Sequence, residues 1–253
     1  MIESSEDLKE KPKAKKVLLF SGGMDSVCYS YLLDPDVLLY IGTGSSYDKE
    51  ESRRLPRIIS LLKREKSLIS IPNWIDFSEQ ERKDFIIPNR NAYLVLKASE
   101  YGETVYLSSV YGDRSTDKDE KFYLLMEKLL NHMHEKSHWS DGRIFSISSP
   151  YKHLTKTELV REYLKKGGEG KILLESYSCY TGKQEPCMQC KPCVRKLVAL
   201  INNNITDNIF NPSRLRDVSW LQPKHEIREK IEKNLYRGRE DNDFKDAMQK
   251  AEM

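Results

Sequence analysis

The chain has 253 residues, of which 38% are hydrophobic and 32% are charged, and its formal net charge is +3. This length suits one large domain, or one domain with a small appendage, and the charge is too small to predict a nucleic-acid partner. No apolar run approaches the ~20 residues of a membrane span, and residues 1–16 lack the apolar core of a signal peptide. We therefore expect a cytoplasmic protein with no membrane partner and no stable nucleic-acid partner.

Short apolar runs alternate with helical segments along most of the chain. Residues 1–15 have no apolar periodicity and are predicted to form a disordered arm. Alternation of this kind predicts an α/β fold, in which a parallel sheet carries helices on both faces. Pro56 predicts a break or a kink in the second helix. The expected strands cover 17–20, 37–41, 67–71, 105–107 and 144–147, and the expected helices cover 24–33, 49–64, 89–101, 120–135 and 155–166.

A glycine-containing loop follows the first predicted strand. Ser21-Gly22-Gly23-Met24-Asp25-Ser26 opens a helix, and the two glycines allow a sharp turn and a close approach to an anion. The unpaired N–H groups of the helix N-terminus favour a phosphate there. The spacing differs from that of a Walker loop and of the dinucleotide fingerprint. Asp25 suits either a nucleotide-bound Mg²⁺ or a cap of the helix.

Four of the five cysteines lie close together in the sequence. Cys179, Cys187, Cys190 and Cys193 have the spacing of a structural zinc site, in which four thiolates leave no open position. The alternatives are a set of buried thiols and a redox Cys-x-x-Cys motif, for which the additional cysteines would be redundant. Cys28 is interpreted as a small core residue.

Four segments in order resemble known families. Ser21 to Ser26 resembles the PP-loop of the ATP-pyrophosphatase superfamily, whose fold is Rossmann-type and adenine-nucleotide α-hydrolase-like. Ile87–Asn91, His153–Val160 and Ser178–Cys193 are similar to segments of the 7-cyano-7-deazaguanine synthases, and the similarity covers most of residues 16–200. Each segment alone is weakly specific, whereas all four in this order are a strong signal.

Two loops depart from the pattern of that family. Residues 112–120 are shorter than the family's substrate loop and lack its Pro-Asp-Cys ending, and residues 42–47 lack its Gly-Gln-Arg-His. Both departures fall where the substrate or the adenine would be recognised. They therefore bear on the identity of the substrate and leave the ATP chemistry in place.

The resemblance implies roles for particular residues. Asp25, Ser26 and Lys156 are the expected catalytic residues, and Lys156 has the alternative of an exposed residue in the first turn of a helix. Arg90 is expected to bind a phosphate or the substrate carboxylate, or else to be a capping or surface arginine. Asp113 and Asp119 are candidates for binding the deazapurine edge. The nucleotide-binding residues would be Phe20, Ser21, Gly22, Gly23, Met24, Asp25, Ser26 and Arg90.

The same resemblance implies an ATP-dependent carbon–nitrogen ligase with Mg²⁺ and one structural Zn²⁺. It would convert 7-carboxy-7-deazaguanine and ammonia to 7-cyano-7-deazaguanine through an adenylated intermediate. The alternatives are another PP-loop adenylating enzyme that acts on a related carboxylate or on tRNA, and a zinc-bearing adaptor with an inactive loop. A homodimer is one hypothesis for the assembly. The expected division is a nucleotide-binding domain at 16–170, a zinc-binding segment and helix at 171–205, and a charged, partly helical tail at 206–253.

Overall fold

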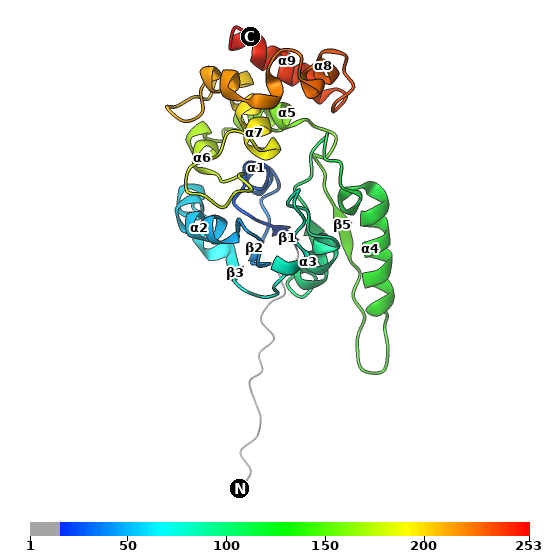
Figure 1. The fold of residues 1–253 in the computed structure, drawn as a ribbon. Helices are drawn as coiled ribbons and strands as arrows, with labels where there is room; N and C mark the ends of the chain where they lie inside the picture. Colours follow the sequence, from blue (N-terminus) through cyan, green and yellow to red (C-terminus); the bar gives the residue numbers. More distant parts are fainter. Residues whose placement is uncertain (1–15) are drawn as a thin grey trace.

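The computed structural model describes residues 16–253, apart from the Lys66 side chain, so the predicted arm at 1–15 lies outside the described residues. A sheet of five strands has the order β3-β2-β1-β4-β5, and every neighbouring pair is parallel. The predicted parallel α/β fold is confirmed (Figure 1). The strands are β1 (Lys16–Leu19), β2 (Val37–Ile41), β3 (Leu68–Ile71), β4 (Thr104–Tyr106) and β5 (Ser146–Ser148).

Helices cover both faces of this sheet. Successive strand residues point to opposite faces, so Leu18 and Leu38 enter one apolar cluster while Val17 and Leu39 enter another. The first cluster contains residues of α1, α2, α5 and α7, and the second contains residues of α3 and α4. The helices are α1 (Met24–Leu33), α2 (Asp48–Leu62), α3 (Arg90–Ala98), α4 (Glu120–Met133), α5 (Lys156–Lys165), α6 (Gly170–Glu175), α7 (Lys191–Asn202), α8 (Glu226–Glu232) and α9 (Glu240–Lys250).

The strand order places a switch point beside β1. The chain leaves β1 through α1 towards β2 on one face, and it returns through α3 to β4 on the other side of β1. The two crossovers diverge there, which opens a crevice at the carboxyl ends of β1 and β4. Ligands of open α/β sheets bind in such a crevice.

The last helices pack on the side of α5 and α7 that faces away from the sheet (Figure 1). Phe244 and Ala247 of α9 are fully buried in the same apolar cluster as Leu197 of α7. The C-terminal residues are therefore part of the core of the described chain.

Two expectations on the elements were wrong. α2 continues through Pro56, so the predicted break is wrong, while the alternative of a kink stays a prediction. Pro56 lies on the exposed side of the helix, where water can replace the missing backbone hydrogen bond. The last strand begins at Ser146 instead of residue 144, because its pairing with β4 starts there and Ile144 is 85% exposed in the preceding loop.

Candidate functional site

The loop between β1 and α1 has the backbone that an anion site needs. Gly22 has a φ of +73°, in the left-handed region that favours glycine. Gly23 is the N-cap of α1, and no side chain caps this helix within the described residues. A Cβ atom on Gly23 would lie 3.2 Å from both Ser21 Oγ and the Tyr177 carbonyl oxygen. The loop therefore leaves the N-terminal amides of a ten-residue helix free to meet an anion.

The two serines of this loop bond to its own backbone. Ser21 Oγ accepts from the Gly23 N–H at 3.2 Å, and Ser26 Oγ donates to the Gly23 carbonyl at 2.9 Å. Both residues line the cavity described below, so their hydroxyls lie beside the helix N-terminus.

Asp25 and Lys156 meet across the loop. A capping box formed by Thr155 and Glu158 starts α5 and fixes Lys156 as its first residue. The Lys156 ammonium donates to Asp25 Oδ2, and Lys156 is only 9% exposed, so the alternative of an exposed lysine is wrong. Asp25 does not cap α1. Its Oδ1 is buried without a hydrogen-bond partner in the described chain, which suits a cation ligand.

One cavity lies at the carboxyl ends of β1, β2 and β4. It brings together most of the predicted site residues, whereas Gly22 and Asp119 are absent from its lining. The predicted residues that line it are Phe20, Ser21, Gly23, Met24, Asp25, Ser26, Arg90, Asp113 and Lys156.

The two candidate substrate aspartates differ in position. Asp113 lines the cavity, but its Oδ1 accepts from Arg195 at 2.8 Å and its Oδ2 lies 3.9 Å from the Lys118 ammonium. Burial raises the pKa of Asp113, yet these two cations hold it well below its usual range. Asp119 instead caps α4, because its Oδ1 accepts from the Phe122 N–H at 2.7 Å.

Arg90 projects into the cavity from the first turn of α3. Its guanidinium donates to the Tyr47 hydroxyl, and its Nε is buried without a hydrogen-bond partner among the described residues. Tyr47 stacks on Tyr180 with ring centroids 5.4 Å apart, and both tyrosines line the same cavity. Asn89 is the N-cap residue of this helix, so the alternative of a capping arginine does not apply.

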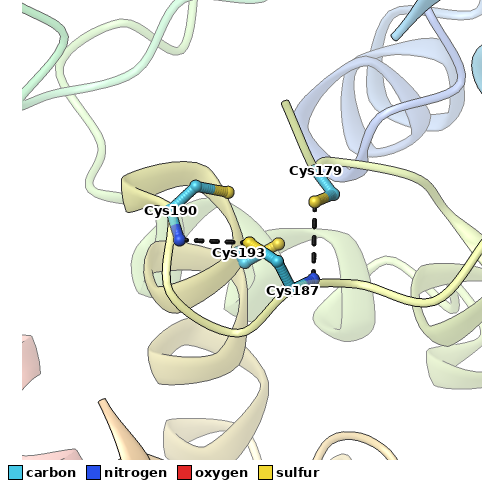
Figure 2. Close-up of side chains that lie close together, drawn as sticks. All are labelled: Cys179, Cys187, Cys190 and Cys193. Atoms are coloured by element: carbon cyan, nitrogen blue, oxygen red, sulfur yellow. Dashed lines mark hydrogen bonds between the residues drawn. The ribbon is translucent and has the colours of Figure 1, made fainter. Parts of the chain in front are cut away.

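The four clustered cysteines converge in space. Figure 2 shows their sulfur atoms pointing toward one another, and all four lie within 4.8 Å of each other. Four thiolates on one zinc ion would be about 3.8 Å apart, given a Zn–S distance of about 2.3 Å. The donor set therefore fits a tetrahedral zinc site, and it leaves no ligand position for substrate.

Backbone N–H groups support these sulfur atoms. Cys187 N–H donates to Cys179 Sγ at 3.4 Å, and Cys190 N–H donates to Cys187 Sγ at 3.3 Å (Figure 2). Gln189 N–H also donates to Cys187 Sγ, at 3.4 Å. Such hydrogen bonds orient thiolate ligands and stabilise their charge. Cys28 is fully buried in the core, as expected.

The cysteine segment contacts the loop after β1. Tyr177 N–H donates to the Gly22 carbonyl at 3.2 Å, two residues before Cys179. Ser178 and Cys179 both line the cavity. A metal that orders this segment would therefore also hold one wall of the cavity.

Sequence reasoning missed eight charged or aromatic residues of this lining. Tyr180 and Arg195 lie next to zinc cysteines, and this proximity could have drawn attention to them. Glu51 is one of three acidic residues in the first turn of α2, a pattern that a helix N-terminus favours for any protein, so no sequence signal singles it out. The missed residues are Tyr40, Tyr47, Asp48, Glu51, Lys118, Tyr177, Tyr180 and Arg195.

Comparisons with known proteins agree with this geometry. A family model described as "Queuosine biosynthesis protein QueC" matches residues 54–204, more than half of the chain. A 7-cyano-7-deazaguanine synthase from Hahella chejuensis is 26% identical over 218 residues, covering 76% of this chain and 91% of the relative. The synthase from Archaeoglobus fulgidus is 24% identical, covering 81% and 92% respectively. Synthase 1 from Colwellia psychrerythraea is 23% identical, covering 77% and 97%.

Proposed function

The chain belongs to the QueC family of queuosine biosynthesis proteins, and we propose that it is an ATP-dependent ligase that makes 7-cyano-7-deazaguanine from 7-carboxy-7-deazaguanine and ammonia. The printed names of its relatives support this reaction. One observation carries the proposal: a free helix N-terminus, Lys156 and Arg90 line one cavity at the switch point of the sheet. Three positive features in one cavity suit a polyphosphate and a carboxylate.

The reaction needs ATP because a carboxylate has no good leaving group. In the proposed sequence the carboxylate attacks the α-phosphorus of ATP, and pyrophosphate leaves. Ammonia then attacks the acyl carbon of the mixed anhydride, AMP leaves, and an amide forms. A second ATP activates the amide oxygen in the same way, and loss of AMP and a proton gives the nitrile.

The residues of the chain bind and orient in this scheme. The amides of residues 24–26 and the Ser21 and Ser26 hydroxyls would bind the pyrophosphate portion of ATP. Lys156 would turn from Asp25 towards the phosphates and offset the charge that develops on the leaving group. Asp25 would hold Mg²⁺, which supplies charge neutralisation at the phosphates when it is bound.

Arg90 and the zinc segment have different roles. Arg90 would bind the substrate and not the phosphates of ATP, because it extends from α3, which lies on the opposite face of the sheet from α1. We assign the four cysteines to one structural zinc ion, which would order residues 179–193 against the loop after β1. Under this assignment residues 16–170 hold the nucleotide and residues 171–205 complete the cavity.

Location and assembly complete the proposal. Among residues 16–253 no helix has both the length and the apolar character that crossing a bilayer requires. We expect the protein in the cytoplasm, where a reducing environment keeps zinc thiolates intact. We keep a homodimer as the hypothesis for its assembly, which light scattering of the purified protein would measure.

The proposal is tested by product analysis. The purified protein is incubated with 7-carboxy-7-deazaguanine, ammonium and MgATP. The bases and nucleotides are then separated and identified by mass spectrometry. We expect the nitrile, AMP and pyrophosphate. An amide end product, or an adduct to another amine, would show that this chain performs a different reaction after adenylation. ADP and phosphate would exclude the proposed cleavage of ATP.

A further inference from the structure

Four carboxylates line the cavity, and two of them pair with cations. Asp25 accepts from the Lys156 ammonium, and Asp113 accepts from Arg195 at 2.8 Å. Ion pairs of this kind hold a carboxylate in place and use part of its acceptor capacity, so that of the four oxygens only Asp25 Oδ1, the proposed cation ligand, lacks a partner in the described chain. Neither Asp25 nor Asp113 is therefore well suited to accept hydrogen bonds from the edge of a base.

The other two carboxylates come from the start of α2. Asp48 accepts from the Thr43 N–H and from the Ser45 hydroxyl, so both of its oxygens have partners. Glu51 is different, because its side chain makes no hydrogen bond or ion pair with any group in residues 16–253 that the structure describes. A half-buried carboxylate that makes no hydrogen bond to the described chain has both oxygens available to accept hydrogen bonds from a ligand.

Arg90 lies close enough to Glu51 to influence its charge, yet the two are not an ion pair. The N–O separation exceeds 4 Å, since no Glu51–Arg90 pair occurs among the described salt bridges. Arg90 has only the Tyr47 hydroxyl as a partner, and its Nε is unpaired within the described chain. The Glu51 carboxylate, which has no partner in the described chain, and the Arg90 guanidinium, which has one, therefore line the same cavity.

The geometry points to a site for the Watson–Crick edge of a guanine-type base, and we propose that Glu51 and Arg90 form it. Such an edge presents an acceptor, O6, beside two adjacent donors, N1–H and N2–H₂. The Glu51 carboxylate would accept from both donors, and the Arg90 guanidinium would donate to O6. This inference rests on the proposed function, and it makes Glu51 the residue that selects the base.

The ionisation of Glu51 gives the site a pH dependence. Burial, together with the nearby Asp48 carboxylate, raises the pKa of Glu51 to about 8, although Arg90 opposes this shift. Tyr47 and Tyr40 are the other titratable groups near this carboxylate. Only the ionised form accepts from both donors, so binding of the base should tighten as the pH rises through the Glu51 pKa of about 8 and then level off.

Adenine is the competing occupant, and one substitution separates the two bases. An adenine edge offers one donor, N6–H₂, beside one acceptor, N1, which a protonated carboxyl matches and an ionised carboxylate does not, so the two bases are compared at pH 9, above the pKa of Glu51. Glu51→Gln replaces one acceptor oxygen by an NH₂ donor, so it gains a match to adenine and loses the match to a guanine-type edge. The variant also removes a half-buried charge, and we expect it to fold.

The experiment measures binding without catalysis. Calorimetric titration of 7-carboxy-7-deazaguanine in the absence of ATP is compared for wild type, Glu51→Gln and the matched control Glu50→Gln. Glu50 lies in the same helical turn, but it pairs with Arg53 and Arg54 and is absent from the cavity lining. We expect Glu51→Gln to weaken binding by roughly 10- to 100-fold. We expect Glu50→Gln and the affinity for ATP to change little.

An analogue that lacks the 2-amino group, 7-carboxy-7-deazahypoxanthine, tests whether Glu51 contacts the Watson–Crick edge of the base. Wild type should bind this analogue more weakly than the full base, whereas Glu51→Gln should bind both almost equally. Equal affinity of wild type and Glu51→Gln for the full base, or a loss confined to ATP, overturns the inference even if the nitrile is formed. The predicted binding pattern without nitrile formation supports the site and rejects the proposed reaction.

Discussion

Asp25→Asn is the substitution whose effects the structure defines most sharply. In the free protein Asp25 pairs with Lys156, and their side chains are 20% and 11% exposed. The substitution keeps the shape of the side chain and removes its charge, so it leaves the lysine ammonium without a counter-charge. Removal of one partner from a fully buried pair costs about 3–5 kcal/mol.

The cost here should be smaller, because both side chains border a cavity and keep some contact with solvent. We expect a loss of about 1–3 kcal/mol in the free energy of unfolding, in the range for hydrogen bonds to charged groups. For a chain of this size that loss lowers Tm by roughly 2–12 °C. The rate of pyrophosphate release should fall much more, by ~10²–10³, because Mg²⁺ loses its proposed ligand beside the developing charge.

A double variant separates stability from catalysis. In Asp25→Asn/Lys156→Met the uncompensated ammonium is gone. The loss in unfolding free energy of the double variant should therefore be smaller than the sum of the losses of the two single variants, by on the order of 1 kcal/mol. The loss of activity should remain in the double variant, since both groups are proposed to act on the phosphates.

The assay is pyrophosphate release at saturating MgATP and substrate, with thermal unfolding measured on the same samples. Lys152→Ala is the control, because Lys152 pairs with Glu120 at 3.2 Å and is absent from the cavity lining. Its activity should stay near that of wild type. A folded Asp25→Asn protein with wild-type pyrophosphate release, or an active double variant, would refute the assignment of the loop.

Three further predictions follow from the geometry. Cys187→Ser should lower Tm and solubility, and so should removal of zinc by a chelator, with activity lost in proportion to the amount of folded protein. Cys28→Ala should leave the zinc content unchanged. Elemental analysis should find one zinc ion per chain, and zinc-free active protein would refute this. Glu51→Gln should raise Tm more at pH 9 than at pH 5, and the two increases should differ by at least ~2–4 °C. The pKa of Glu51 is about 8 in the folded protein and about 4.3 in the unfolded chain, so the stability of the wild type falls as pH rises between these values. A Tm difference between wild type and variant that does not change with pH would exclude the ionisation of Glu51 as its cause. Gly22→Ala should cost about 1 kcal/mol or more in unfolding free energy because of the positive φ, as measured by denaturant titration, and an unchanged midpoint would contradict the loop geometry.

The fold was predictable because its signals are local. Buried runs such as Val37–Ile41 have the length and composition of central strands, and the alternation with helices dictates a parallel sheet. Pro56 shows the limit of a local rule, since an exposed helix face tolerates a missing hydrogen bond. The start of β5 was also misplaced, because pairing with β4 determines it and the apolar character of Ile144 does not.

The positions of the candidate site residues were predictable where one short segment contains the whole motif. The loop before α1 and the cysteine cluster are contiguous, so spacing alone indicates their chemistry. Residues whose roles depend on partners far along the chain were not distinguishable. Arg195 contacts Asp113, which lies 82 positions earlier, and Asp119 became a helix cap, a role that any aspartate before a helix can take.

Transfer of an isotope label tests the central claim most directly. The carboxylate of 7-carboxy-7-deazaguanine is prepared with ¹⁸O at both oxygens and incubated with the protein, ammonium and unlabelled MgATP. If the substrate oxygens attack the α-phosphorus, mass spectrometry should find one ¹⁸O atom in AMP for each activation and none in pyrophosphate, together with the nitrile. AMP without label, or label in any other phosphate product, would contradict an adenylated intermediate and with it the proposed function.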